Sequence, residues 1–299
     1  MTPRPASWGI TSILLGGVAI GSAAIFMRLA PVAPSAAAFW RMALSIPVFM
    51  IFVLAVPANR QQLKAINRPQ MVQMALVGFW FALDLFFWHW AVARTTVANA
   101  TLLANLASVF TVVVGFFLFK ETFSKLFLAG LVLAVAGAAT LVGQNAAYSP
   151  QYLTGDFLGL ITACALTGYI VTAAKARMVL STTLLMAGSG VISAALLLAP
   201  ALLADGAFIP STIEGWLPLI GLALVTHVLG QGLIIYGFAH ISASYGSIGL
   251  LIQPVIAAIL AWVIFSETLG PLHIAGAIMI LVGIAVSQQR RRPGGGPTA

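Results

Sequence analysis

Apolar runs of about twenty residues follow one another along almost the whole chain, and they constrain its fold more than any other feature. A helix of this length crosses the hydrocarbon core of a bilayer. Hydrophobic residues make up 61% of the 299 residues and charged residues only 7%, whereas a soluble domain carries roughly 25% charged residues. Because the chain has too little polar surface to face water, it must face lipid, which excludes the soluble classes of protein.

These runs predict an all-α integral membrane protein with ten transmembrane helices. Backbone groups that face lipid must be hydrogen-bonded within the protein, which favours helices. Strands of a membrane β-barrel alternate between polar and apolar residues over about ten positions, and the runs here do not alternate. The expected spans are residues 8–30, 35–56, 70–93, 97–118, 125–143, 155–175, 182–204, 216–239, 244–265 and 271–288.

The basic residues predict how the helices are oriented in the membrane. Short cytoplasmic loops carry an excess of Lys and Arg, and with ten spans both termini lie on the same side. Of the 14 basic residues, all but Arg28, Arg41 and Arg94 fall in the loops and tails of that side. We therefore expect both termini in the cytoplasm, with residues 289–299 as a disordered basic tail. The net charge of +8 then reflects topology and contact with anionic lipids, not nucleic-acid binding.

One segment of the chain occurs twice, at a spacing of 146 residues. Residues 119–137 read FKETFSKLFLAGLVLAVAG, and residues 265–283 read FSETLGPLHIAGAIMILVG. The first copy follows the fourth span and the second follows the ninth, so the two copies face opposite sides of the membrane. We therefore predict two inverted five-helix repeats, residues 1–146 and 147–288, related by a pseudo-two-fold axis in the membrane plane. Many transporters are built from such repeats.

The residues that the two copies share have a structural interpretation. Glu121 and Glu267 precede predicted helices, where an acidic residue complements the positive end of the helix, and the threonines that follow them can cap it. Small residues allow helices to approach closely, and glycines recur seven residues apart on one helix face at Gly130, Gly137, Gly276 and Gly283. The repeated signature is therefore interpreted as scaffold, with direct contact between the glutamates and a substrate as the alternative.

This pattern resembles the drug/metabolite transporter superfamily, in its EamA-domain branch. The shared features are ten helices in two five-helix units, the Glu-Thr turn before the fifth and tenth helices, and the glycines after it. Arg41 in AFWRMALSIPV is also similar to an arginine early in the second helix of that branch. The resemblance covers residues 8–288 and implies an inner-membrane exporter of amino acids and other metabolites. Within the branch, the aromatic third helix is most similar to that of the aromatic amino acid exporters of the YddG type.

Two charged residues lie deep within predicted spans. Asp84 is the only acidic residue deep inside a span, and a charge at the centre of a bilayer is costly unless it faces a partner or a watery cavity. Arg41 lies about seven residues from the outer end of the second span, and Asp84 about nine from that of the third. At ~1.5 Å per residue, their depths differ by about 3 Å. An Arg41–Asp84 pair is therefore expected, as a structural ion pair, as a gate or substrate site, or with Asp84 as a proton-coupling carboxylate.

Aromatic and polar side chains at membrane depth are the remaining candidates for a substrate cavity. Trp80, Asp84 and Trp88 share one face of the third span, and an apolar cavity lined by rings suits amphipathic or aromatic solutes. The alternative is that the rings face lipid and that the polar groups only join neighbouring helices, at about 0.6 kcal/mol each. The candidates are Phe79, Trp80, Asp84, Trp88, Thr101, Asn105, Ser108, Tyr169, His227, Gln231, Ser247 and Gln253.

Sequence motifs of enzymes and of ATP hydrolysis are absent. The chain contains no H-E-x-x-H, G-x-S-x-G, Walker A or G-x-G-x-x-G pattern, and its histidines lack the spacing of metal ligands. We therefore expect no catalytic residue, no metal and no cofactor. An integral-membrane lipid enzyme, the alternative from a different class, would have to combine Asp84 with His89 or His227. Asp84 and His89 lie about 140° apart around one helix, which argues against it.

The sequence therefore predicts an inner-membrane exporter that works by alternating access through one central cavity. Its expected substrates are small amphipathic metabolites, with amino acids, including aromatic ones, as the first candidates. An exporter of drugs, nucleosides or sugar derivatives from the same superfamily is the alternative. We expect the protein to contact its solute and membrane lipids, to bind no nucleic acid and to act as a monomer.

Overall fold

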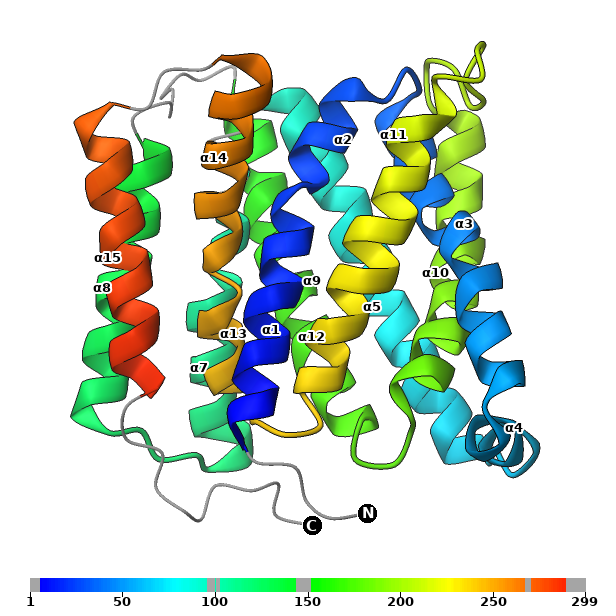
Figure 1. The fold of residues 1–299 in the computed structure, drawn as a ribbon, viewed down its shortest axis with the longest axis horizontal. Helices are drawn as coiled ribbons and strands as arrows, with labels where there is room; N and C mark the ends of the chain where they lie inside the picture. Colours follow the sequence, from blue (N-terminus) through cyan, green and yellow to red (C-terminus); the bar gives the residue numbers. More distant parts are fainter. Residues whose placement is uncertain (1–5, 96–99, 101–102, 144–151, 267–269, 289–299) are drawn as a thin grey trace.

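The helices of the computed structural model follow the apolar runs of the sequence and lie side by side in one bundle (Figure 1). The structure describes residues 6–95, 100, 103–143, 152–266 and 270–288. Helices of the first half are α1 (Ala6–Gly21), α2 (Ala23–Leu29), α3 (Pro34–Ala55), α4 (Pro57–Lys64), α5 (Arg68–Arg94), α7 (Ala107–Phe119) and α8 (Lys125–Gly143). Those of the second half are α9 (Leu153–Ala176), α10 (Thr182–Leu203), α11 (Trp216–Gly221), the π-helix η2 (Leu222–Gln231), α12 (Gly232–Gly237), α13 (Ala243–Gly249), α14 (Ile252–Phe265) and α15 (Pro271–Gln288).

The apolar helices make ten membrane crossings, as the sequence predicts. Within the described residues, eight helices of at least 18 residues are apolar enough to span a membrane, and two shorter apolar helices cover Leu103–Phe119 and Lys125–Thr140. Three crossings combine consecutive pieces, namely α1 with α2, α13 with α14, and α11 with η2 and α12. The short α4 lies at the end of the bundle and is not a crossing (Figure 1). The chain is therefore a multi-pass, all-helical membrane protein.

Prolines and a capping box decide where the early helices begin. Helices α3, α4 and α5 each carry a proline in their first turn, where the missing backbone N–H is not needed. The side chain of Asn67 accepts a hydrogen bond from the backbone N–H of Gln70 at 3.0 Å, and the Gln70 side chain accepts one from the backbone N–H of Asn67 at 3.2 Å. This capping box starts α5, the helix that carries Asp84 into the bundle.

Equivalent positions in the two halves have equivalent backbone conformations. Lys120 and Ser266, which are 146 residues apart, follow α7 and α14, and both have a φ of 55°. Residues other than glycine rarely adopt this left-handed conformation, so its recurrence supports a structural duplication. The fourth and ninth crossings are also both interrupted, just before α7 and between α13 and α14. Because five crossings separate equivalent helices, these helices run in opposite directions, and the two halves are inverted repeats.

The glycines of the repeated segment join α8 to α15 at one edge of the bundle (Figure 1). A Cβ added at Gly130 would lie 2.5 Å from the backbone nitrogen of Ser287, and one at Gly283 would lie 2.5 Å from that of Ala134. No side chain fits at such distances, so the glycines allow the two backbones to touch. These glycines are therefore scaffold, as their spacing predicts.

The first helix of each half packs inside the other half. α1 lies against η2, α12, α13 and α14, whereas α9 lies against α5 and α7. Glycines make both contacts close, because a Cβ at Gly16 would lie 2.6 Å from the carbonyl oxygen of Gly230, and one at Gly168 would lie 2.5 Å from the Trp80 ring. This exchange brings helices of both halves around one central space, where the candidate site lies.

Candidate functional site

A cavity of about 130 Å³ lies between the two halves. A single water needs about 10–15 Å³ of such space, so the cavity accommodates several waters or a small solute. Its walls come from both halves and include α1, α3, α5, α9, η2 and α14. Its polar side chains are those of Arg41, Asp84, Asn105, Tyr169, Gln231 and Gln253, and its aromatic ones include Phe81 and Trp88.

The two charged side chains of the cavity are almost completely buried. Arg41 on α3 is 5% exposed, and Asp84 on α5 is 8% exposed. The two charges are close enough to attract each other, yet within the described part of the chain no nitrogen–oxygen contact shorter than 4.0 Å joins them. Nε of Arg41 also has no hydrogen-bond partner among the described residues. Both charged groups therefore keep the capacity to bind a solute in the cavity.

The Phe81 ring links Arg41 to a network of aromatic side chains. Its centroid lies 4.6 Å from that of the Tyr169 ring. Cζ of Arg41 lies 5.8 Å from the centre of the Phe81 ring, which is a cation–π distance. The amide of Gln231 donates a hydrogen bond to the hydroxyl of Tyr169 at 2.7 Å. These contacts hold the Tyr169 hydroxyl and the Gln231 amide in place at the cavity wall.

Interrupted helices border the cavity in both halves. The stretch before α7 contributes Ala104 and Asn105, and the junction of α13 with α14 contributes Leu250, Gln253 and Pro254. Irregular backbone at membrane depth is tolerated only where it is buried in protein or lines a cavity. Nδ2 of Asn105 is buried without a partner in the described structure, so it is available as a donor to a solute.

A serine ladder joins α7 to α13 on the side of the cavity where α1 begins (Figure 1). Oγ of Ser108 donates to the backbone carbonyl of Ser247 at 2.9 Å, and Oγ of Ser247 donates back to the carbonyl of Ser108 at 3.4 Å. Oγ of Ser244 donates to the carbonyl of Thr111 at 3.5 Å. These four residues therefore tie together helices from different halves.

Seven of the residues predicted from the sequence come together around the cavity: Arg41, Asp84, Trp88, Asn105, Tyr169, Gln231 and Gln253. Phe81, which is not among the predicted residues, lies there too. A signal for it was present, because Phe81 precedes Asp84 by three residues, and residues three apart are neighbours on a helix surface.

Two of the predicted aromatic residues lie away from the cavity. Phe79 is 43% exposed on the surface of α5, which corresponds to the alternative that this ring faces lipid. Trp80 packs in the interface between α5 and α9, because Gly168 has no side chain and leaves room for the indole. The predicted candidate Thr101 lies outside the described residues.

Three predicted polar residues are also placed elsewhere. Ser108 and Ser247 belong to the serine ladder, which corresponds to the alternative of hydrogen bonding between helices. His227 and Gln231, which the spacing of four places on one helix face, both lie in η2. Gln231 reaches the cavity, whereas His227 is 1% exposed and lies between the rings of Phe81 and Phe49, at centroid distances of 5.3 and 6.0 Å.

Comparison with protein families shows two matches along the chain. The model of the EamA-like transporter family matches residues 7–143 and again residues 153–288.

Individual relatives are similar over most of the chain. The pseudopaline exporter CntI of Pseudomonas aeruginosa is 26% identical over 233 residues, which cover 78% of this chain and 80% of that protein. An uncharacterized transporter of Archaeoglobus fulgidus is 26% identical over 281 residues, covering 94% and 96%. A solved crystal structure has a similar fold, with a TM-score of 0.79 and 21% identity, and the alignment covers 95% of this chain and 96% of that one.

Proposed function

Because this chain belongs to the EamA-like transporter family, we propose that it exports small amphipathic metabolites, with amino acids, including aromatic ones, as its substrates. Family membership makes the protein a membrane transporter and not an enzyme. Assignment to the aromatic amino acid exporters of the YddG type is the finer part of this proposal.

The pair of unbridged charges in the cavity carries the proposal. A buried charge within the membrane is costly and usually serves function, and here Arg41 and Asp84 share one cavity without a direct salt bridge. A zwitterion satisfies both groups, since its carboxylate pairs with the guanidinium and its ammonium with the carboxylate. The rings of Phe81, Trp88 and Tyr169 provide an apolar surface for the solute's side chain.

Transport follows from alternating access around this cavity. A site between inverted repeats opens to one side and then to the other as helices of one repeat rock against the other. Both termini lie in the cytoplasm of an inner-membrane protein, with the basic loops on that side. The protein works as a monomer, because the site is completed by helices of one chain.

Export of drugs, nucleosides or sugar derivatives is the second candidate. The name of the relative CntI supports export of a metabolite but not of a particular amino acid. The amides of Asn105, Gln231 and Gln253 line the same cavity and suit hydroxyl groups or bases as well. A neutral sugar, however, leaves both buried charges without partners.

Reconstitution in liposomes tests the proposal. The purified protein is assayed with labelled phenylalanine, leucine, phenethylamine, 3-phenylpropionate, uridine and glucose, with and without a pH gradient and with protein-free liposomes as the control. We expect both amino acids to cross faster than the amine or the carboxylate, each of which lacks one charge. Flux of uridine or glucose without flux of amino acids would favour the second candidate. Flux that does not respond to the gradient would argue against proton coupling.

A further inference from the structure

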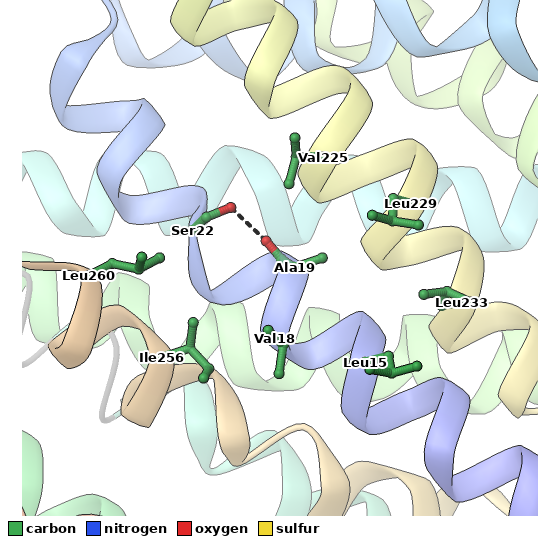
Figure 2. Close-up of a pocket in the computed structure, with 9 residues that line it drawn as sticks. All are labelled: Leu15, Val18, Ala19, Ser22, Val225, Leu229, Leu233, Ile256 and Leu260. Atoms are coloured by element: carbon green, nitrogen blue, oxygen red, sulfur yellow. Dashed lines mark hydrogen bonds between the residues drawn. The ribbon is translucent and has the colours of Figure 1, made fainter.

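A second hollow lies on the outside of the bundle, between α1, α14 and the crossing that contains η2 and α12 (Figure 2). This lipid-facing groove has a volume of about 470 Å³ and is lined by apolar side chains such as Leu15 and Leu229, which are 56% and 53% exposed. The polar member of the lining, Ser22, donates its hydroxyl to the carbonyl of Ala19 at 2.6 Å. The groove is therefore continuous with the lipid-facing surface and presents no polar group that lacks a partner.

Several of the equivalent positions in the other half of the molecule carry rings or are covered by one. Ser22 corresponds to Gly168, which lies 146 residues later. The indole of Trp80 covers Gly168 so closely that a Cβ there would lie 2.5 Å from it. Other residues of the groove also have aromatic counterparts, since Val225, Leu233 and Ile256 correspond to Phe79, Phe87 and Phe110. The second half thus carries smaller side chains at positions where the first half has rings.

We propose that one acyl chain of a membrane phospholipid binds in the lipid-facing groove, where it takes the place of these rings. The groove lies midway along three membrane crossings, so the surrounding solvent is hydrocarbon. An apolar cavity of about 150 Å³ binds benzene, and the groove is roughly three times larger, which suits a segment of alkyl chain. An empty groove would forfeit van der Waals contacts along its whole lining, so binding of the acyl chain is favourable.

The bound acyl chain lies against the first crossing at the point where that crossing is interrupted. α1 ends at Gly21, and α2 begins at Ala23. Gly21 and Ala23 line the central cavity, whereas Ala19 and Ser22 line the groove. One helix therefore separates the lipid from the solute, and the lipid supports the cavity wall from outside.

Native mass spectrometry of the purified full chain tests the site. Delipidated protein is titrated with phosphatidylethanolamine that carries dibrominated acyl chains, which mark each bound lipid by mass. The test variant combines Val225→Phe, Leu233→Phe and Ile256→Phe, which copies the rings of the other half. The control variant combines Val132→Phe, Ile274→Phe and Ile278→Phe, at exposed positions of α8 and α15. We expect the wild type and the control to retain one tightly bound lipid that the test variant binds at least tenfold more weakly.

Equal lipid binding by the wild type and the test variant would overturn the proposal. If the triple variant does not fold, the three single substitutions decide, because each is expected to weaken binding of the same lipid two- to threefold, and unchanged binding in all three contradicts the site.

Discussion

Arg41 and Asp84 are the two charged residues that line the central cavity. Each is almost completely buried. The two groups attract each other, but they form no direct salt bridge within the described structure. Phe81 lies beneath the guanidinium and holds it by a cation–π contact. The cavity thus contains one basic and one acidic group, which under the proposed function suits a solute with one charge of each sign.

Replacement of Asp84 by asparagine keeps the shape of the side chain and removes its charge. Hydrogen bonds to charged groups contribute about 1.5–3 kcal/mol, so we expect Asp84→Asn to lower the rate of phenylalanine transport by about tenfold or more. The measurement is uptake into liposomes at equal amounts of reconstituted protein. Asp205→Asn, at an exposed acid after α10, is the matched control and should leave uptake unchanged. Full activity of Asp84→Asn would remove Asp84 from the site.

At the scale of elements, the closest contacts depend on residues without side chains. The helices α8 and α15 meet at glycines of the repeated segment, and α1 and α9 enter the opposite halves at others. In a membrane the hydrophobic effect does not drive helices together, so close van der Waals packing is a main source of their association. The glycines therefore determine which helices are neighbours, and the polar residues then act within that frame.

Glycine-to-alanine substitutions should affect thermal stability differently at the α8–α15 contact and at a site with more space. In Gly283→Ala, the new Cβ would lie 2.5 Å from the backbone nitrogen of Ala134, and overpacking of this kind costs about 1–3 kcal/mol. In Gly190→Ala, the nearest atom to the new Cβ is 3.6 Å away, and alanine favours the helix by about 1 kcal/mol. Thermal unfolding in detergent should show a lower melting temperature for the first variant and an equal or higher one for the second. A melting temperature of Gly283→Ala equal to that of the wild type would contradict the proposed role of Gly283.

At the scale of the whole molecule, the two halves are related by sequence but differ at the cavity. On the side where α1 begins, Ser108 and Thr111 bond to α13 in the serine ladder. Their equivalents in the other half, Pro254 and Ala257, line the cavity instead. Inverted repeats that adopt different local packing are the basis of alternating access. In this structure the hydrogen bonds of the serine ladder are formed.

A disulfide across the serine ladder should hold the transporter in this state. Ser108→Cys and Ser247→Cys are combined in a Cys164→Ser background, which removes the native thiol. The two serines exchange hydrogen bonds with each other's backbone, so their replacements lie close enough to be bridged. Oxidation is expected to abolish uptake and a reductant to restore it, whereas Cys164→Ser alone should transport under both conditions. Unchanged uptake with the disulfide formed would show that the ladder does not open during transport.

Much of the site could be anticipated because polar residues at membrane depth are rare. Asp84, Arg41 and Asn105 stand out in apolar runs because a polar or charged side chain inside the membrane costs free energy. Trp80 has the same helical spacing to Asp84 as Trp88 does, yet Trp88 lines the cavity and Trp80 fills a gap above Gly168. Periodicity gives the angle between two residues of one helix, but not which neighbouring helix offers space for their side chains.

The sequence by itself determined that the chain crosses the membrane ten times in two inverted halves, because apolar length and a 146-residue repeat are properties of the chain alone. Only the tertiary structure decided which deep side chains share a cavity, because the rotation of each helix about its axis is set by contacts with the other half. The lipid-facing groove likewise appears only after folding, because its lining comes from three crossings that are far apart in the sequence.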